Sequence, residues 1–266
     1  MTLDSFEEID ADKQLVAIGE RLEETSINEL SSYSLDPSML IPKFESCSDL
    51  KKASSDDDGL YTLWSDDQQK FIPTLCMFDS TGSYAVMQSR VKGKEDLNFL
   101  AMMKDGYEDG FGNSKNEFWL GLDRLSEITK TKTVMKVVLA KNEFSKTYIY
   151  KGFQITSKSD EYRLLYDSFE NKNEIDYLSM SKGAPFHDYR IRYSQQDPYR
   201  CMLSGAWWFY CTTSRMSDGF MNSHVQSNLN GVFTEKTNLD YILANRWDSW
   251  PYENGEFTET RILLLN

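Results

Sequence analysis

The sequence predicts an α+β fold with a central antiparallel sheet and short helices. Short β-rich runs alternate with glycine and polar turns from Leu60 onward, and no βαβ period repeats. The chain has 266 residues, 40% of them hydrophobic, which is enough to bury a sizeable core without a metal ion. A doubly wound parallel sheet is therefore not expected.

The beginning of the chain, residues 5–33, has the pattern of an amphipathic helix. Its apolar positions, spaced mostly three and four apart, are Leu15, Ile18, Leu22 and Leu30. Pro37 and Pro42 prevent its continuation. We therefore expect a short N-terminal helix and linker over residues 1–45. Two roles stay open: packing on the domain that follows, or pairing with copies of itself to form a homo-oligomer, although no sustained heptads are present.

The elements expected after residue 46 are mostly strands. Five runs have the composition of strands: Leu60–Trp64, Tyr84–Gln88, Thr133–Leu139, Lys146–Phe153 and Tyr162–Tyr166. Two stretches have a helical pattern: Lys94–Met103 and Leu122–Thr129. This order of short strands and few helices is typical of an antiparallel α+β domain.

The charge and the apolar runs exclude several classes of partner. A net charge of -13 repels phosphate backbones and anionic lipid headgroups, so nucleic acid and bare membrane are not expected partners. Val137–Ala140 and Ile262–Leu265 are the longest apolar runs and are too short to span a bilayer. The first residues lack the basic and apolar regions of a signal peptide. If the protein is secreted, we expect this chain to be a mature form without its signal.

The four cysteines form two pairs that are close in sequence, Cys47 with Cys76 and Cys201 with Cys211. None has the Cys-x-x-Cys spacing of zinc or thioredoxin-like sites. Their spacing favours two disulfides and an oxidising compartment. The alternative, four reduced cysteines buried in a cytosolic protein, stays open on spacing alone.

Residues 82–125 contain a dense series of glycine, aromatic and polar positions. They are Gly82, Tyr84, Val86, Gln88, Arg90, Asp96, Gly110, Phe111, Gly112, Asn113, Glu117, Phe118, Trp119, Leu120, Gly121 and Leu122. This series resembles the central block of the fibrinogen C-terminal-like domains, the family of ficolins, tachylectins and angiopoietins. Leu97 stands where the family has phenylalanine. The glycines of Gly110–Asn113 permit a tight turn with positive φ, and the aromatics after it are expected to be core.

The resemblance extends on both sides of this block. Flanking features occur in the family's order: Cys47, Gly59, Tyr61, Cys76, Trp207, Trp208, Cys211, Asn228, Leu229, Asn230, Gly231, Trp247 and Trp250. It therefore implies one fibrinogen C-terminal-like domain over residues 46–266, with a loop-rich C-terminal binding region. It also implies the same cysteine pairing that the spacing favours.

The sequence offers little for catalysis or metal binding. Its two histidines, His187 and His224, lie in no metalloprotease motif, and neither nucleophile-elbow nor P-loop motifs occur. Relatives commonly bind calcium on an Asp-x-Asp loop after a phenylalanine that corresponds here to Phe186. Arg190 and Arg192 occupy the aspartate positions, and a guanidinium cannot ligate calcium. We expect no enzyme activity, no cofactor and no calcium at that loop. A displaced site is the alternative, with Asp188, Gln195 and Asp197 as its ligands.

The resemblance also implies a C-terminal aromatic pocket for acetylated ligands. The residues in the family's pocket positions are Trp208, Tyr210, His224 and Phe233. In relatives a histidine directly follows the fourth cysteine, whereas here the insertion Thr212–Ser223 separates Cys211 from His224. The insertion could extend the pocket, cover it or contact a protein. The competing interpretation is that Trp207 and Trp208 belong to the core.

Together these features predict a secreted, non-enzymatic recognition protein. The leading hypothesis is lectin-like binding of acetylated sugars or related ligands, because many soluble members of the family bind them. The alternative is a protein-ligand role, with a cell-surface receptor or peptide bound through the same region. A third is a matrix or assembly role with no small ligand.

Overall fold

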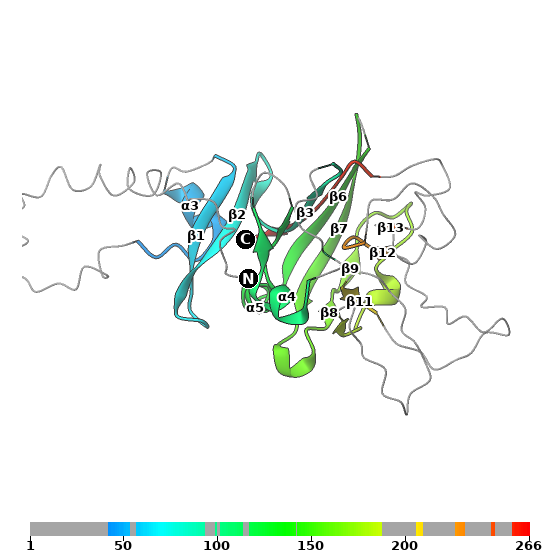
Figure 1. Ribbon diagram of the computed structural model, residues 1–266. Helices are drawn as coiled ribbons and strands as arrows, with labels where there is room; N and C mark the ends of the chain where they lie inside the picture. The colour runs from blue at the N-terminus through cyan, green and yellow to red at the C-terminus, as the bar shows by residue number, and fades with distance from the viewer. Residues whose placement is uncertain are drawn as a thin grey trace, which may run out of the picture. The chain divides into compact units, whose positions relative to one another are not determined.

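The computed structural model describes residues 42–53, 57–93, 99, 102–113, 117–141, 143–187, 206–209, 227–231, 246–247 and 257–266 (Figure 1). The predicted helix over residues 5–33 lies outside this part of the chain. Contacts divide the chain into two compact units. The first ends at Ala85 and also includes Asn266, and the second covers Val86–Leu265.

The first unit contains the helix α3, Cys47–Lys52, and the strands β1, Gly59–Ser65, and β2, Lys70–Asp79. β1 and β2 form an antiparallel hairpin, and β2 also pairs with the beginning of β3, Gly82–Val91. The disulfide Cys47–Cys76 links α3 to β2, which confirms the first predicted pair. Ser46 caps α3, because its Oγ accepts a hydrogen bond from the backbone N–H of Asp49 at 3.1 Å.

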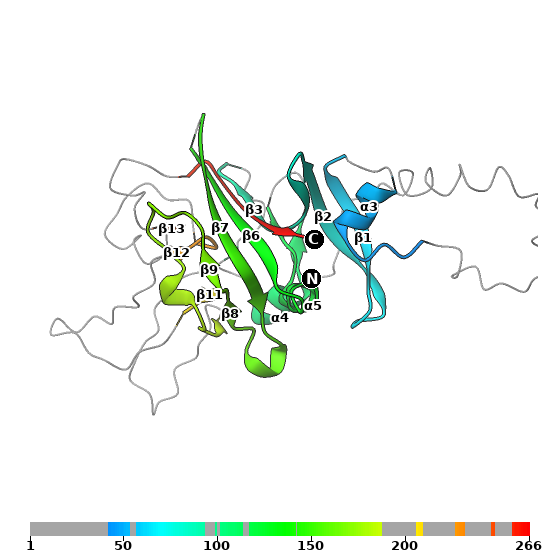
Figure 2. The ribbon, with the colours of Figure 1, turned by 180° about the vertical axis from the view of Figure 1, so that it is seen from behind.

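The second unit is built on an antiparallel sheet in the order β3-β14-β6-β7-β8. Its long strands are β6, Thr133–Lys141, β7, Phe144–Ile155, and β14, Glu259–Leu265. The C-terminal strand β14 is central, because it pairs with β6 over Glu259–Leu264 and also lies next to β3 (Figures 1 and 2). The C-terminal end of the described chain therefore completes the sheet.

Short elements extend or flank this sheet. The helices are α4, Lys104–Asp109, α5, Leu122–Ile128, and the 3-10 turns η2, Lys158–Asp160, and η3, Ser179–Ser181. The short strands are β4, Phe111–Gly112, β5, Phe118–Trp119, β8, Leu164–Leu165, β9, Ser168–Phe169, β10, Phe186–His187, β11, Trp207–Trp208, β12, Ser227–Asn228, and β13, Arg246–Trp247. No helix in the described part of the chain is long and apolar enough to cross a membrane.

The predicted antiparallel α+β architecture is confirmed, with differences at particular elements. The helix expected over Lys94–Met103 is wrong at its described end, because Met103 has an extended backbone and α4 begins after it. The strand expected over Tyr162–Tyr166 shortens to β8, because Glu161 and Tyr162 have positive φ angles of 58° and 52°. The strands β2 and β14 were not predicted.

The glycine-rich turn before β5 has the conformation that its sequence predicts. Gly110 and Gly112 have φ angles of 94° and 100°. A Cβ atom on Gly112 would lie 2.0 Å from the carbonyl oxygen of Glu117, so this close approach of β4 and β5 requires glycine. The aromatics that follow are core residues, with Phe118 and Trp119 fully buried.

Candidate ligand-binding site

The candidate site is built on two short described segments, Ala206–Phe209 and Ser227–Gly231, which we call the base segments. Within the first, β11 pairs with β10 in the register Phe186 to Trp208 and His187 to Trp207. The indole N–H of Trp208 donates a hydrogen bond of 2.7 Å to the carbonyl oxygen of Tyr162. Both tryptophans are buried, so the first base segment is fixed as part of the core.

Aromatic packing connects this segment to the glycine-rich block. The ring of Trp208 lies 4.9 Å from that of Phe186 and 6.2 Å from that of Trp119. Trp119 in turn contacts Tyr107 at 5.4 Å, and its indole N–H donates to the Tyr107 carbonyl oxygen at 2.9 Å. The rings therefore form one continuous aromatic core that supports the first base segment.

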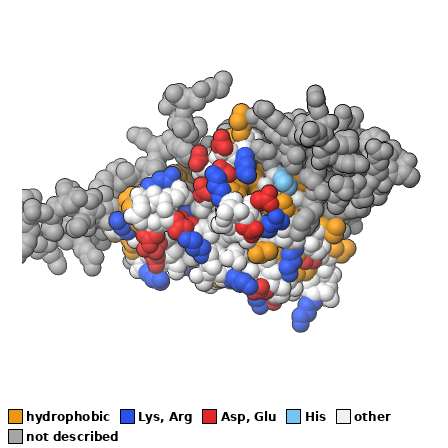
Figure 3. Space-filling model, turned by 90° about the horizontal axis from the view of Figure 1, so that it is seen from below, with side chains coloured by type: hydrophobic (Ala, Val, Ile, Leu, Met, Phe, Trp, Pro, Cys, Tyr) orange, Lys and Arg blue, Asp and Glu red, His pale blue; other side chains and the backbone are white. Residues whose placement is uncertain are grey.

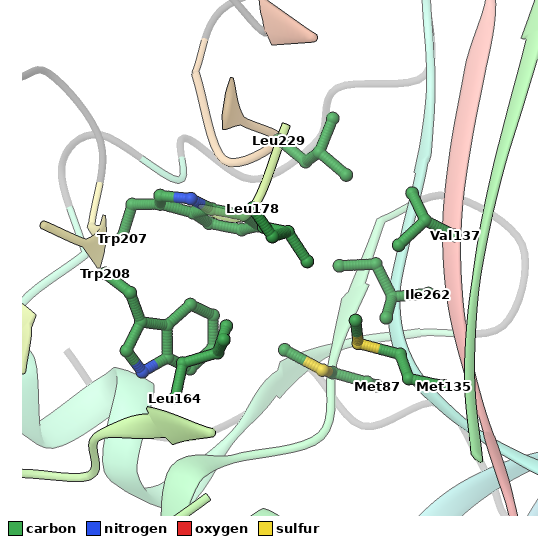
Figure 4. Close-up of a pocket in the computed structure, with 9 residues that line it drawn as sticks. All are labelled: Met87, Met135, Val137, Leu164, Leu178, Trp207, Trp208, Leu229 and Ile262. Atoms are coloured by element: carbon green, nitrogen blue, oxygen red, sulfur yellow. The ribbon is translucent and has the colours of Figure 1, made fainter. Parts of the chain in front are cut away.

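A small apolar cavity separates the tryptophans from the sheet (Figure 4). Met87, Met135, Val137 and Ile262 project from the sheet on one side, Trp207 and Trp208 lie opposite, and Leu164, Leu178 and Leu229 complete the lining. The volume of about 10 Å³ is no larger than one water molecule requires, and the lining offers that water no polar partner. This cavity is a packing void and not a ligand pocket.

A buried polar network fixes the second base segment to the sheet. On β3, Gln88 and Arg90 project to the same face because they are two residues apart. The amide of Gln88 donates to the Leu229 carbonyl oxygen at 2.8 Å. Arg90 donates from Nη1 to the same carbonyl at 3.3 Å and also to the carbonyl oxygen of Gly231. Two side chains of one strand therefore hold the backbone of the Leu229–Gly231 turn.

Asn230 joins the two base segments. Its side-chain amide donates to the Ala206 carbonyl oxygen at 2.8 Å, and its Oδ1 lies 3.3 Å from the amide nitrogen of Gln88. On the far side, Thr260 of β14 donates to Oε1 of Gln88 at 3.2 Å. All of these side chains are buried. The network thus runs from the central strand β14 through β3 to both base segments.

A buried ion pair completes the network. Nε of Arg90 donates to Oε1 of Glu117 at 2.7 Å, and the two side chains are 3% and 0% exposed. The guanidinium also lies over the ring of Phe99, 4.4 Å from its centroid. A guanidinium at this depth requires a counter-charge and hydrogen-bond acceptors, and Glu117 with the two carbonyls supplies them.

The turn that receives the Trp208 indole is itself strained. Glu161 and Tyr162 both occupy the left-handed region of φ, although neither is glycine. Their carbonyl oxygens accept from the backbone of Phe186 at 3.0 Å and from the Trp208 indole. Tyr162 also donates its hydroxyl proton to Asp123. Burial and this acidic acceptor raise the pKa of the Tyr162 phenol above its ordinary value.

A second group of buried tyrosines lies on β7 and the segment after it. Tyr166 donates to Oδ2 of Asp176 at 2.6 Å, and its ring contacts that of Tyr150 at 5.0 Å. Burial, with the nearby Asp176 carboxylate, raises the pKa of both phenols. These tyrosines remain neutral over the physiological range and act as packing residues.

The structure describes only part of the predicted site. Trp208 lies in the first base segment, fully buried, and its role as a pocket wall stays a prediction. Tyr210, His224 and Phe233 lie outside the described residues, as do Cys201, Cys211 and the loop with Arg190 and Arg192. Within the described residues, no group of three or more histidine, cysteine, aspartate or glutamate side chains is arranged to hold a metal ion.

The sequence reasoning missed the residues that fix the site. Gln88, Arg90, Glu117 and Asn230 were recognised as matching positions but were given no role. The spacing Val86-x-Gln88-x-Arg90 on a predicted strand could have indicated one buried face with two polar groups that need partners. His187 was also missed as a neighbour of the site, where its ring lies 4.9 Å from that of Phe209.

Charged side chains of both signs share the face of the described residues that Figure 3 shows. Figure 3 shows acidic and basic side chains interspersed over one face of the described residues. Exposed pairs of opposite charge include Lys132 with Asp167 at 2.6 Å and Lys151 with Glu170 at 2.7 Å. The net negative charge of the chain is therefore not gathered into one described patch on that face.

Comparison with known families identifies the domain. Residues 43–264 match the family model described as fibrinogen beta and gamma chains, C-terminal globular domain. The chain belongs to this family. The family is non-catalytic, and this domain is accordingly not an enzyme.

Relatives and solved structures agree with this assignment. Rat angiopoietin-2 is 27% identical over 88% of this chain and 46% of its own length. Human microfibril-associated glycoprotein 4 is 28% identical over 81% of this chain and 83% of its own length. The fibrinogen-like globe domain of human ANGPTL6 has a TM-score of 0.67 at 22% identity, with 87% of this chain and 98% of that chain covered.

A second solved structure has the same fold. It is the lamprey fibrin D-dimer complexed with the peptide ligand Gly-His-Arg-Pro-amide, with a TM-score of 0.66 at 19% identity over 96% of this chain and 82% of that chain. The chain spans less than half of the length of the rat angiopoietin-2 and mouse angiopoietin-4 chains that it matches.

Proposed function

We propose that this chain is a secreted recognition domain that binds acetylated sugars or related acetylated ligands at an aromatic site on the two base segments. The observation that carries the proposal is the buried network through Gln88, Arg90 and Asn230, which fixes both segments to the sheet and to each other. A fixed base lowers the entropic cost of binding, because the supporting backbone needs no further ordering.

The nominated ligand residues are covalently close to this base. Tyr210 directly follows Phe209, His224 stands three residues before Ser227, and Phe233 stands two residues after Gly231. A chain of three residues reaches at most about 11 Å, so each nominated residue is tethered near one base segment. Aromatic faces with a single imidazole suit a ligand that has an apolar methyl group and a polar carbonyl.

An extracellular location is part of the same proposal. The Cys47–Cys76 disulfide supports it, because such bonds persist mainly in oxidising compartments. The relatives named above include a microfibril-associated glycoprotein, which is consistent with an extracellular setting.

A protein or peptide ligand is the second candidate. The lamprey fibrin D-dimer, whose fold this chain shares, is complexed with a short peptide ligand, and this supports the candidate. The Thr212–Ser223 insertion also supplies Met216, Phe220 and Met221, side chains suited to an apolar protein contact.

The test compares N-acetylglucosamine with glucosamine, which differs by the acetyl group. We expect the full chain to be retained on immobilised N-acetylglucosamine and eluted by the free acetylated sugar but not by glucosamine. Phe233→Ala and His224→Ala should each weaken binding by at least about 1 kcal/mol with the melting temperature nearly unchanged. Phe144→Ala is the matched control, because Phe144 is an aromatic residue that is 77% exposed at the first position of β7.

Two results would decide against acetyl recognition. Equal retention by the two sugars would remove the acetyl group from the proposal. Saturable binding to cells that free sugars do not compete would favour the protein-ligand role instead.

A further inference from the structure

The β1–β2 hairpin of the first unit has one enclosed face. Tyr61 and Leu63 of β1 and Ile72, Thr74 and Cys76 of β2 project to this face and are buried. The Cys47–Cys76 disulfide holds α3 against it (Figure 1). This face is therefore buried, with α3 linked to it at Cys76.

The opposite face of the hairpin is also apolar, although it is partly exposed. Leu60, Thr62 and Trp64 of β1 pair with Leu75, Pro73 and Phe71 of β2. Of these six residues only Leu75 is buried, and the others are half-buried. An antiparallel hairpin that meets water on its second face normally carries polar side chains there. This face, which we call the outer hairpin face, instead has the composition of an interface.

The chain enters the first unit at the edge of this face. The carbonyl oxygen of Phe44 accepts a hydrogen bond of 2.7 Å from the backbone N–H of Trp64. Nζ of Lys43 lies over the Trp64 ring, 3.7 Å from its centroid. The chain therefore joins the first unit next to the Trp64 end of the outer hairpin face.

The segment that precedes this point has a matching apolar stripe. From Leu15 to Leu30 a helix rises about 22 Å, and the seven residues of β1 extend about 23 Å. The connection from residue 31 to residue 42 can extend to about 40 Å, which allows the segment to fold back. The sequence has no sustained heptads, so it lacks the repeat by which helices of a coiled coil pair with one another.

We infer that residues 5–33 dock as an amphipathic helix on the outer hairpin face of the same chain. The stripe from Leu15 to Leu30 covers Trp64 and its neighbours, and this packing supplies the tertiary contact that a short amphipathic helix needs to be stable in water. Docking makes the N-terminal segment part of the globular domain. It does not depend on the ligand-binding function proposed above.

Hydrogen exchange on the full chain tests this inference. In the wild type, amides of residues 12–24 should exchange at least about tenfold more slowly than in the variant Leu15→Ser with Leu22→Ser. The matched control is Lys13→Ser with Glu24→Ser, which introduces the same two serines on the opposite helix face and leaves the net charge unchanged. This control should retain the protection.

Changes on the hairpin side test the surface itself. Trp64→Ser should remove the protection of residues 12–24 while the amides of β2 stay protected. If that variant unfolds the first unit, a photo-crosslinking residue at position 18 of the otherwise native chain gives an independent measurement. Its products should map to residues 59–77.

Three outcomes would overturn the inference. Rapid exchange of residues 12–24 in the wild type would show that the segment does not dock. Protection that rises with protein concentration, together with a mass above that of the monomer, would show pairing between copies. Crosslinks outside residues 59–77 would assign the helix to another surface.

Discussion

The ion pair between Arg90 and Glu117 offers the sharpest test of how the base segments are held. We predict that Glu117→Gln destabilises the domain by about 3 kcal/mol, because removing one member of a buried pair leaves the other charge uncompensated. The value lies at the lower end of the usual range because the glutamine oxygen can still accept from Arg90 Nε. The ratio of folded to unfolded protein should fall by roughly two orders of magnitude.

Chemical denaturation followed by circular dichroism measures this loss. The matched control is Asp167→Asn, which removes one charge from the Lys132–Asp167 pair, whose side chains are 52% and 59% exposed. An exposed pair of this kind contributes at most about 1 kcal/mol. If Glu117→Gln costs no more than Asp167→Asn, the buried pair does not stabilise the second unit as we argue.

A double variant separates stability from positioning. Replacing Arg90 and Glu117 together by methionine removes both buried charges and should recover much of the lost stability. It also removes the donors that hold the carbonyls of Leu229 and Gly231. We therefore expect amide exchange in residues 227–231 to remain faster than in the wild type even when global stability is restored. Normal protection there would show that the ion pair has no positioning role.

Three further predictions follow from the same contacts. Asn230→Ala should lower the free energy of unfolding by about 1–3 kcal/mol, because the Ala206 carbonyl loses its buried donor. Amide hydrogen exchange in residues 206–209 should become faster, and unchanged exchange there would contradict the link between the base segments. Replacing Cys47 and Cys76 together by serine should lower the free energy of unfolding by about 3.6 kcal/mol, measured by denaturant titration against the reduced and oxidised wild type. Burial raises the pKa of the phenols of Tyr150, Tyr162 and Tyr166 in the folded protein, so the unfolded chain loses these phenolic protons first as the pH rises. Above pH 10 the free energy of unfolding should therefore fall by about 1.4 kcal/mol per pH unit for each of the three. Absorbance at 295 nm should then show these tyrosines ionising only with unfolding, and their free titration near pH 10 would refute this.

The sequence predicted strands well where hydrophobic and polar residues alternate clearly. It predicted them less well where a proline or a continuous apolar run obscures that alternation. β2 was missed because Pro73 interrupts its pattern. In the structure β3 pairs with β2 only over Cys76–Asp79, so Pro73 lies beyond that pairing, where a missing N–H is tolerated. β14 was missed because Ile262–Leu265 is a continuous apolar run, which does not distinguish a central strand from other buried segments.

The candidate site was predictable in its residue types but not in its connections. Trp208 was predicted as a pocket wall, with the competing interpretation that Trp207 and Trp208 belong to the core, and the structure buries both tryptophans. The contact of Gln88 with Leu229 joins residues separated by 141 positions, and no local pattern reports such a pairing. The spacing of Gln88 and Arg90 implies only that two buried polar side chains on one face of a strand need hydrogen-bond acceptors. The structure shows that these acceptors include the carbonyl oxygens of Leu229 and Gly231, far along the chain.

The arrangement also separates what fixes the site from what can select a ligand. Gln88, Arg90, Glu117 and Asn230 are buried and mutually bonded, so a change at any one of them leaves a polar partner unsatisfied and alters stability and positioning together. The proposed ligand residues Tyr210, His224 and Phe233 lie outside the described residues, and the variants proposed above test them separately from this network. All four of these base residues are among the positions that carry the resemblance to other fibrinogen C-terminal domains. A resemblance carried by buried base residues does not specify a ligand, so ligand preference has to be measured at the residues nominated beside the base.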